Sequence, residues 1–308
     1  MGERALITQV QEGVYLIDTM ALGLKGFVAA YVLLDEKVAL IDTGYASSLD
    51  VLLSDLDSIG LELSRVDYVV VTHVHLDHAG AAGSFVKFAT NARVLAHPKG
   101  VKHLVDPERL VRSVEEVYGR ATAACFGRTE PIPPERISGV DDNASIPLGK
   151  MRLRFLHTQG HAPHHLCVYE EANALLFTGD SVSGTYPGFP VFVPPSVPPS
   201  FDFFGAVSDL RRLMGLEPRL LMTPHFGVRR ASRDVFEDEI SLLHWWRDLI
   251  SSEKERCDDV ESITDRACEA LAKRFGVYVK EVPGYVRLNI KLAVEGMVGY
   301  LDRLATRG

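Results

Sequence analysis

The feature that most constrains this fold is the string THVHLDH at residues 72–78. It directly follows a short, continuously apolar run that is typical of a buried strand. His73 and His75 stand two residues apart, so in an extended segment both side chains point to the same side. Asp77 and His78 come next, where we expect the chain to turn into a helix. Because adjacent residues point in different directions, this one segment can serve two metal ions.

Three further candidate ligands, His161, Asp180 and His225, each stand where a predicted strand ends in a turn. A single histidine at a strand end is usually an ordinary hydrogen-bonded residue. The dense string and three more candidates in the same context instead favour a metal site. Imidazole and carboxylate donors in this mixture suit Zn²⁺, with iron or manganese as alternatives. The sequence therefore predicts two divalent metal ions as cofactors, with zinc placed first.

The predicted elements alternate between strands and helices twice and end in helices. Predicted strands cover residues 5–10, 13–18, 27–34, 38–41, 68–71, 93–96, 151–157, 166–169, 174–178 and 219–222. Predicted helices cover residues 49–59, 108–118, 201–214, 233–251, 259–274 and 286–305. The Pro-rich segment 186–200 is predicted to be an ordered surface loop without regular structure. No glycine-rich fingerprint follows the first strands, so this order favours an α/β fold of the αβ/βα sandwich type over a Rossmann fold.

Length and composition describe an ordinary globular protein. The chain has 308 residues, of which 46% are hydrophobic and 24% charged. We expect a catalytic domain over residues 1–232 and a helical extension over 233–308. The net charge of −8 argues against general binding to nucleic acid or to anionic membranes. In residues 235–308 acidic side chains outnumber basic ones by 14 to 11, which argues against DNA binding by the extension.

Targeting signals and cysteines favour a cytoplasmic protein. The amino-terminal segment is charged from its third residue and has no apolar stretch of a signal peptide. The longest apolar runs are far shorter than the roughly 20 residues of a membrane span. Cys125, Cys167, Cys257 and Cys268 show no CxxC spacing, which favours a reduced chain. The expected partner is a small-molecule substrate, and a homo-oligomer is left open.

These motifs resemble those of the metallo-β-lactamase superfamily over about residues 5–230. THVHLDHAG at 72–80 is a full match to the family's THxHxDHxG signature, and LIDTG at 40–44 resembles its DTG element. The remaining family ligand positions are matched by His161, Asp180 and His225. The resemblance implies a four-layer αβ/βα sandwich, here with a C-terminal helical extension.

The resemblance also implies how the ligands divide. His73, His75 and His161 would hold one metal; Asp77, His78 and His225 would hold the other. Asp180 would bridge the two metals together with a water or hydroxide, and Asp77 would in addition accept or pass a proton as the catalytic residue. The implied activity is hydrolysis of an ester, thioester or lactone of a small metabolite through the bridging hydroxide.

The branch of the family is narrowed by departures from its patterns. True β-lactamases of this fold generally lack the bridging aspartate, so Asp180 argues against them. Flavodiiron proteins usually place Glu where His75 stands. A glyoxalase II-like branch fits better, although His164 stands where those proteins usually have Gly. The lactonase, alkylsulfatase, RNase Z-like and persulfide dioxygenase branches stay compatible with the ligand set.

Residues around the metals are predicted from their positions. Asp42 and His165 are expected to orient metal-binding histidines rather than to bind metal. The substrate pocket is predicted to use the aromatic residues Tyr186, Phe189, Phe192 and Trp245. The alternative reading of these rings is that they pack only against their own loop or helix.

Three alternative functions accompany the leading one. A mononuclear iron enzyme resembling persulfide dioxygenases would use the same residues with O₂. A phosphodiesterase or nuclease is disfavoured because the chain shows no basic surface for nucleic acid. A non-catalytic binding module is disfavoured because it has no evident need for the complete ligand set.

Overall fold

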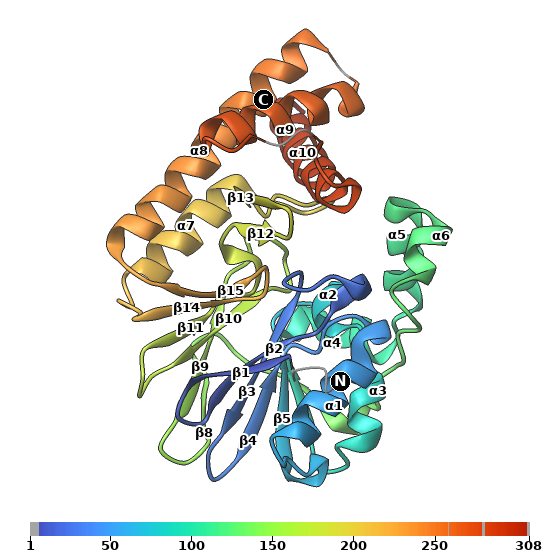
Figure 1. Cartoon of the computed structure of the whole chain (residues 1–308), viewed down its shortest axis with the longest axis vertical. Helices are drawn as coiled ribbons and strands as arrows, with labels where there is room; N and C mark the ends of the chain where they lie inside the picture. Colours follow the sequence, from blue (N-terminus) through green and yellow to red (C-terminus); the bar gives the residue numbers. More distant parts are fainter. Residues whose placement is uncertain (1–5, 258, 279–280, 307–308) are drawn as a thin grey trace. The chain divides into compact units, whose positions relative to one another are not determined.

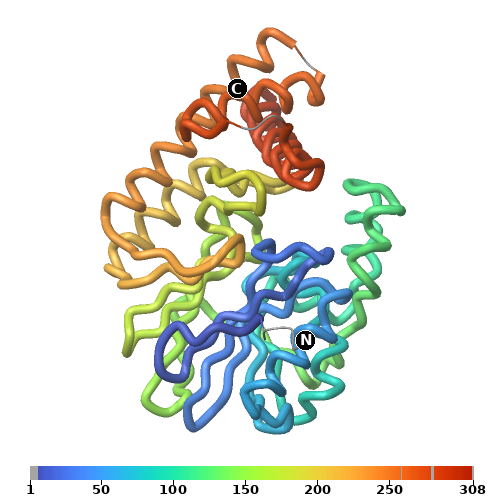
Figure 2. Tube along the Cα trace, viewed as in Figure 1, coloured from blue at the N-terminus to red at the C-terminus, as the bar shows by residue number. Residues whose placement is uncertain are grey.

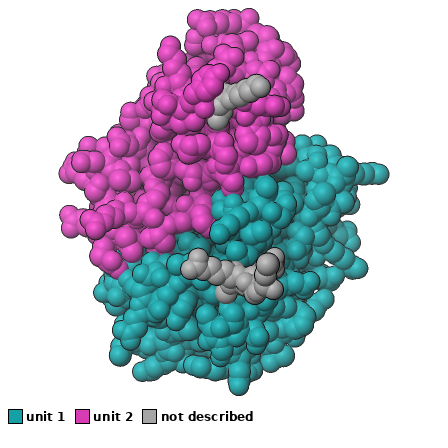
Figure 3. Space-filling view, in the orientation of Figure 1, with its two compact units in different colours: residues 1–157, 164–179 teal, residues 158–163, 180–308 magenta. Residues whose placement is uncertain are grey.

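The computed structural model describes residues 6–257, 259–278 and 281–306. By contacts, the chain divides into two compact units, which Figure 3 colours separately. Unit 1 comprises residues 1–157 and 164–179, and unit 2 comprises residues 158–163 and 180–308. This division is by packing, whereas the predicted boundary at residue 232 marks the point after which only helices are predicted. The predicted catalytic domain and helical extension stay a prediction.

A seven-stranded sheet forms the core of unit 1, with its strands in sequence order. The first four strands pair antiparallel, and β4 to β7 pair parallel. Their bounds are β1 (Ile7–Gln11), β2 (Val14–Asp18), β3 (Ala29–Leu34), β4 (Val38–Ile41), β5 (Val66–Val71), β6 (Arg93–Ala96) and β7 (Ile137–Gly139). Because carboxyl ends of parallel strands meet at one edge of a sheet, the segments after β4, β5 and β6 lie close together.

Helices pack on this sheet and form its hydrophobic core (Figure 1). Leu40 and Val69 of the central strands are fully buried and belong to one cluster with Leu56 of α1 and Phe85 of α3. The helices of unit 1 are α1 (Leu49–Ser58), α2 (Leu76–Ala79), α3 (Ala82–Phe88), α4 (Pro98–Val105), α5 (Glu108–Tyr118) and α6 (Arg120–Ala124). Strand β4 and residues 69–71 of β5 are apolar and buried because helices or other chain segments cover them on both faces.

Small residues after the THVHLDH string allow close packing. A Cβ atom on Gly80 would lie 2.3 Å from the Leu76 carbonyl oxygen and 2.9 Å from the Ala46 amide nitrogen. A Cβ atom on Gly83 would lie 1.9 Å from the Glu130 carbonyl oxygen. Glycine at these positions therefore lets the start of α3 lie directly against neighbouring backbone.

Unit 1 also contains an antiparallel set of four strands. They are β8 (Ser145–Pro147), β9 (Arg152–His157), β10 (Leu166–Glu170) and β11 (Leu175–Phe177), paired in the order β8–β9–β10–β11. The predicted strands 166–169 and 174–178 correspond to β10 and β11, which pair antiparallel.

Unit 2 begins its regular structure with a hairpin that the sequence analysis missed. Strands β12 (Gly184–Tyr186) and β13 (Phe189–Val193) pair antiparallel, with Tyr186 opposite Phe189. The prediction that 186–200 lacks regular structure is therefore wrong for its first part. Pro190 lies inside β13 with its side chain exposed, and a two-stranded sheet tolerates proline because each strand has a free edge.

The rest of unit 2 is a second hairpin and four helices, which Figure 2 follows to the C-terminal end of the described chain. They are β14 (Leu220–Thr223), β15 (Gly227–Arg230), α7 (Phe203–Met214), α8 (Arg233–Arg256), α9 (Val260–Arg274) and α10 (Gly284–Ala305). Helix α8 packs on α7, α9 and α10. The three predicted C-terminal helices are confirmed. Among the described residues no helix is long and apolar enough to cross a membrane.

Candidate metal centre

The THVHLDH string occupies the turn between β5 and α2 in unit 1. His75 is still extended and precedes the first residue of α2. The Nε2 atom of His73 lies 2.9 Å from the Nδ1 atom of His75. Thr43, which follows β4, donates to the His78 carbonyl from both its amide (2.7 Å) and its hydroxyl (3.0 Å). The ends of the neighbouring parallel strands β4 and β5 thus hold this turn, and nitrogen atoms of His73 and His75 lie close together in it.

Asp42 holds the THVHLDH string in place through its carboxylate. Its Oδ1 accepts from the Thr72 amide at 2.8 Å, and its Oδ2 accepts from the Thr72 hydroxyl at 2.9 Å. The same Oδ2 atom lies 2.9 Å from Nδ1 of His78. A carboxylate oxygen only accepts, so His78 carries its proton on Nδ1 and turns Nε2 away, toward Asp77 Oδ2 at 3.6 Å. Asp42 therefore orients the candidate ligand His78 from the side opposite to its Nε2 atom.

His165 lies behind His73 and is fully buried. Their ring centroids are 5.0 Å apart. A Cβ atom on Gly179, which has a φ of +45°, would lie 2.3 Å from Nε2 of His165. The neighbouring amide of Leu166 donates to the Thr72 carbonyl at 2.8 Å. His165 thus packs between the string and the glycine that precedes Asp180.

His164, which the predicted site did not include, also lies beside the string. Its ring centroid is 5.9 Å from that of His75, 6.4 Å from that of His73 and 6.1 Å from that of His103 on α4. Burial lowers the pKa of His103, with added repulsion from Lys102 and Arg109. A histidine two residues before the start of β10 was a signal that could have brought His164 into the predicted set.

In unit 2, Asp180 lies between two histidines that are candidate ligands. Its Oδ2 lies 3.5 Å from Nε2 of His161, and its Oδ1 lies 3.7 Å from Nε2 of His225. All three side chains are buried. Each oxygen of one carboxylate therefore faces a different imidazole, as a carboxylate that bridges two cations would require.

Backbone contacts hold the two histidines of unit 2. The Nδ1 atom of His161 lies 2.7 Å from the Pro195 carbonyl oxygen. The Gly160 amide donates to Asp209 Oδ2 at 2.8 Å, and the carbonyl of His225 accepts from the Thr185 amide at 2.6 Å. The Tyr186 ring lies 5.6 Å from the ring of His225. The His161 ring is thus oriented by the loop after β13, whereas His225 contacts strand β12.

The donor set fits a divalent metal. Nδ1 of His78 and Nδ1 of His161 are engaged by an oxygen, which leaves the Nε2 atoms directed toward carboxylates. A metal-bound histidine characteristically gives its other nitrogen to a carboxylate or carbonyl. The described residues include groups of histidine and aspartate side chains that could hold metal ions. The assignment of each ligand to one metal stays a prediction.

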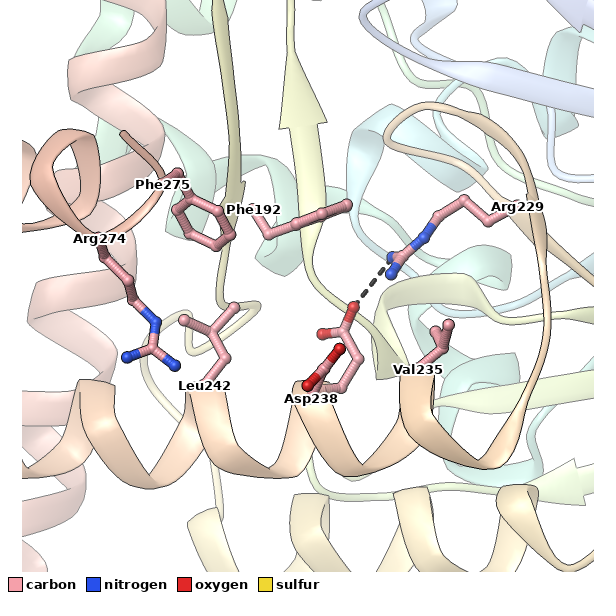
Figure 4. Close-up of a pocket in the computed structure, with 8 residues that line it drawn as sticks. Phe192, Arg229, Val235, Asp238, Leu242, Arg274 and Phe275 are labelled. Carbon is pink, nitrogen blue, oxygen red and sulfur yellow. Dashed lines mark hydrogen bonds and ion pairs between the residues drawn. The ribbon is translucent and has the colours of Figure 1, made fainter. Parts of the chain in front are cut away.

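The predicted substrate residues lie in different surroundings within unit 2. Phe189 is fully buried, and the Trp245 ring lies under the guanidinium of Arg274 at 4.7 Å. Phe192 lines a cavity of about 610 Å³ together with Phe275 and Arg229 (Figure 4). The guanidinium of Arg229 also pairs with the Glu239 carboxylate, with Nη1 2.9 Å from Oε1. The substrate role of these aromatic residues stays a prediction.

Comparisons with known proteins agree with the fold and the motif. A family model described as the metallo-beta-lactamase superfamily matches residues 23–225. A protein of Sulfurisphaera tokodaii, the metallo-beta-lactamase fold-containing protein ST1585, is 28% identical over 75% of this chain and 84% of its own length. The human acyl-coenzyme A thioesterase MBLAC2 is 30% identical over 48% of this chain and 55% of its own.

A solved structure extends the similarity beyond the matched motifs. The crystal structure of an archaeal metallo-beta-lactamase superfamily protein, ST1585 from Sulfolobus tokodaii, has a TM-score of 0.69 and 25% identity. The alignment covers 93% of this chain and 98% of that one. The predicted fold class, an α/β sandwich of this type with added C-terminal helices, is confirmed.

Proposed function

Because the chain belongs to the metallo-β-lactamase superfamily, we propose that it is a dinuclear metal-dependent hydrolase of a small ester, thioester or lactone. The superfamily consists mostly of metal-dependent hydrolases. The observation that carries the proposal is Asp180, whose two carboxylate oxygens face the Nε2 atoms of two different histidines at 3.5 and 3.7 Å.

The proposed ligands fall into two groups. We assign His73, His75 and His161 to one metal and Asp77, His78 and His225 to the other, with Asp180 shared by both. The donors are imidazole nitrogens and carboxylate oxygens, which suit Zn²⁺ and leave iron or manganese as alternatives. Asp180 would add a negative charge shared by both cations.

The residues of the chain have distinct parts in the proposed reaction. When bound, two divalent cations would lower the pKa of water to about 7 and polarise the scissile carbonyl. Asp77, whose carboxylate is partly exposed, would accept or pass the proton that the attacking water loses. Asp42 keeps the proton of His78 on Nδ1, so that Nε2 stays available as a ligand. Asp180 holds the imidazoles of His161 and His225 at one carboxylate.

The proposed substrate is a small molecule with an activated acyl group. A thioester is placed first because the human relative is an acyl-coenzyme A thioesterase by name, although it matches less than half of this chain. The net charge of −8 also disfavours a polyanionic substrate such as RNA.

Metal analysis followed by a substrate panel tests this proposal. We expect close to two metal ions per chain in metal-replete protein, and cleavage of at least one thioester, ester or lactone by the zinc form without oxygen. The iron form is assayed in parallel on glutathione persulfide with oxygen uptake recorded. Persulfide-dependent oxygen consumption, with no acyl cleavage by any metal form, would overturn the proposal in favour of the iron oxygenase.

A further inference from the structure

The imidazole of His161 is held by the backbone of the loop that follows β13. A carbonyl oxygen only accepts a hydrogen bond, so the 2.7 Å contact with Pro195 places the ring proton on Nδ1 of His161. The Nε2 atom is then the nitrogen that faces Asp180, at 3.5 Å. The position of one backbone carbonyl thus determines both the tautomer and the direction of this candidate ligand.

That carbonyl is anchored through the next residue. Pro194 and Pro195 have no N–H groups, so neither can donate a backbone hydrogen bond to its surroundings. The anchor is the fully buried hydroxyl of Ser196. It accepts from Nε1 of Trp246 on α8 at 2.9 Å and donates to the Ala293 carbonyl on α10 at 2.8 Å.

Helix α10 contacts this part of the chain at several further points. A Cβ atom on Gly296 would lie 2.1 Å from the Ser196 carbonyl oxygen, so the helix meets the loop backbone directly. The Tyr285 hydroxyl donates to the Pro187 carbonyl at 2.6 Å, and Arg303 donates to the Pro199 carbonyl at 2.8 Å. Helix α10 therefore contacts the loop at Ser196 and at Pro199, and it also contacts the turn between β12 and β13 at Pro187.

We propose that Ser196 is a positioning residue through which α8 and α10 set the metal affinity of His161. This inference rests on the proposed metal site and assigns the C-terminal helices a part in it. Without the Ser196 hydroxyl, the Pro195 carbonyl can move and the His161 ring can rotate. Loss of the outer partner of a metal-binding histidine typically weakens metal binding about 10–100-fold.

Ser196→Ala tests the inference against a matched control. Thr264→Ala removes another fully buried hydroxyl of the same helical region, one that donates to the Val260 carbonyl within α9 at 2.7 Å. We expect Ser196→Ala to weaken zinc binding about tenfold, measured by competition with a chelator. Thr264→Ala should leave zinc binding within about twofold of wild type. Melting of the metal-free proteins shows whether the two variants lose similar stability.

Two further measurements separate positioning from general packing. The visible absorption of the Co²⁺ form should shift in Ser196→Ala and not in Thr264→Ala, because only the former alters a ligand's surroundings. Trp246→Phe keeps a ring but removes the Nε1 donor. Its effect on zinc affinity should be less than additive with that of Ser196→Ala, because both variants lose the hydrogen bond from Trp246 Nε1 to the Ser196 hydroxyl.

The outcomes distinguish this inference from the proposed function. If His161→Ala weakens zinc binding but Ser196→Ala and Thr264→Ala bind zinc equally well, the positioning role is wrong and the metal site stands. If His161→Ala leaves zinc binding and the Co²⁺ spectrum unchanged, the metal site itself is wrong and the inference fails with it.

Discussion

The two units hold their candidate ligands in different ways. In unit 1, four ligands fall within residues 73–78, and the groups that orient them belong to Asp42, Thr43 and Thr72 at the ends of β4 and β5. These strands pair parallel at the centre of the mixed seven-stranded sheet and are part of its buried core, so the anchors form with the core itself.

In unit 2 the ligands are dispersed along the chain. His161, Asp180 and His225 are separated by long segments, and the contacts of the two histidines come from the loop after β13 and from strand β12. That loop is in turn held by helices α8 and α10, which follow every candidate ligand in sequence. The difference teaches that a dense motif can be positioned by the sheet it follows, whereas scattered ligands depend on packing by distant segments.

The largest effect is expected from Asp180→Asn, which removes the charge shared by both proposed metals. Turnover should fall on the order of 10³-fold, which is about 4 kcal/mol in the barrier. Metal content should drop from two ions per chain to one or none. Elemental analysis and steady-state kinetics measure both quantities. A wild-type rate with full metal content would exclude Asp180 from the site.

Asp42→Asn should weaken metal binding about 10–100-fold through the anchor of unit 1. The amide of Asn can donate to Nδ1 of His78, which would move the ring proton to Nε2 and block the nitrogen that faces Asp77. Chelator competition measures the affinity. If Asp42→Asn weakens metal affinity less than Ser196→Ala does, the contacts of Asp42 in unit 1 position their ligand less strongly than those of Ser196 in unit 2. The expected difference between the two units is then reversed.

Glu239→Gln should have a smaller effect on zinc affinity, because it acts on the segment of unit 2 that follows Asp180. The buried Glu239 carboxylate accepts from the Ser183 amide and from Arg229, each at 2.9 Å. Loss of its charge beside Arg229 should cost about 2 kcal/mol of stability and shift zinc affinity a few-fold. Denaturant unfolding and chelator competition measure these quantities.

Glu237→Gln is the control for Glu239→Gln, because the Glu237–Arg233 pair is exposed and its loss should leave stability almost unchanged. Equal losses of stability in the two variants would show that the buried Glu239–Arg229 pair contributes no more to stability than the exposed pair.

The smallest effect on the metals is expected from His97, a buried residue of unit 1 at the start of α4. Burial, with repulsion from His157 and Lys99, lowers the pKa of His97 to about 4. The unfolded chain therefore binds more protons between pH 6.5 and 4, and stability should fall as the pH drops through this window. The loss should reach about 2 kcal/mol at pH 5.

His97→Asn is the matching test. Asparagine is a good N-cap and retains an acceptor for the Lys99 amide, which His97 Nδ1 binds at 3.0 Å. The variant should show a flatter dependence of unfolding free energy on pH, with unchanged zinc affinity at neutral pH. The same slope in both proteins would mean that His97 does not titrate in this window.

Several elements could be predicted because their local pattern agrees with their environment. The predicted strands 38–41 and 93–96 and the helix 108–118 coincide with β4, β6 and α5. Strand β13 was missed because proline and glycine around it normally mark a loop, while its pairing with β12 supplies the hydrogen bonds that a strand needs. Local residue preferences cannot report a partner that only the folded chain brings near.

The candidate ligands and their chemistry could be read from residue types and spacing, because few side chains bind metals and the string in unit 1 is dense. The groups that orient those ligands could not. Nothing in the spacing of residues indicates that the carbonyl of Pro195 lies against His161, or that Ser196 links it to Trp246 and Ala293. A backbone carbonyl has the same chemistry at every residue, so its role depends entirely on where the packing of the chain puts it.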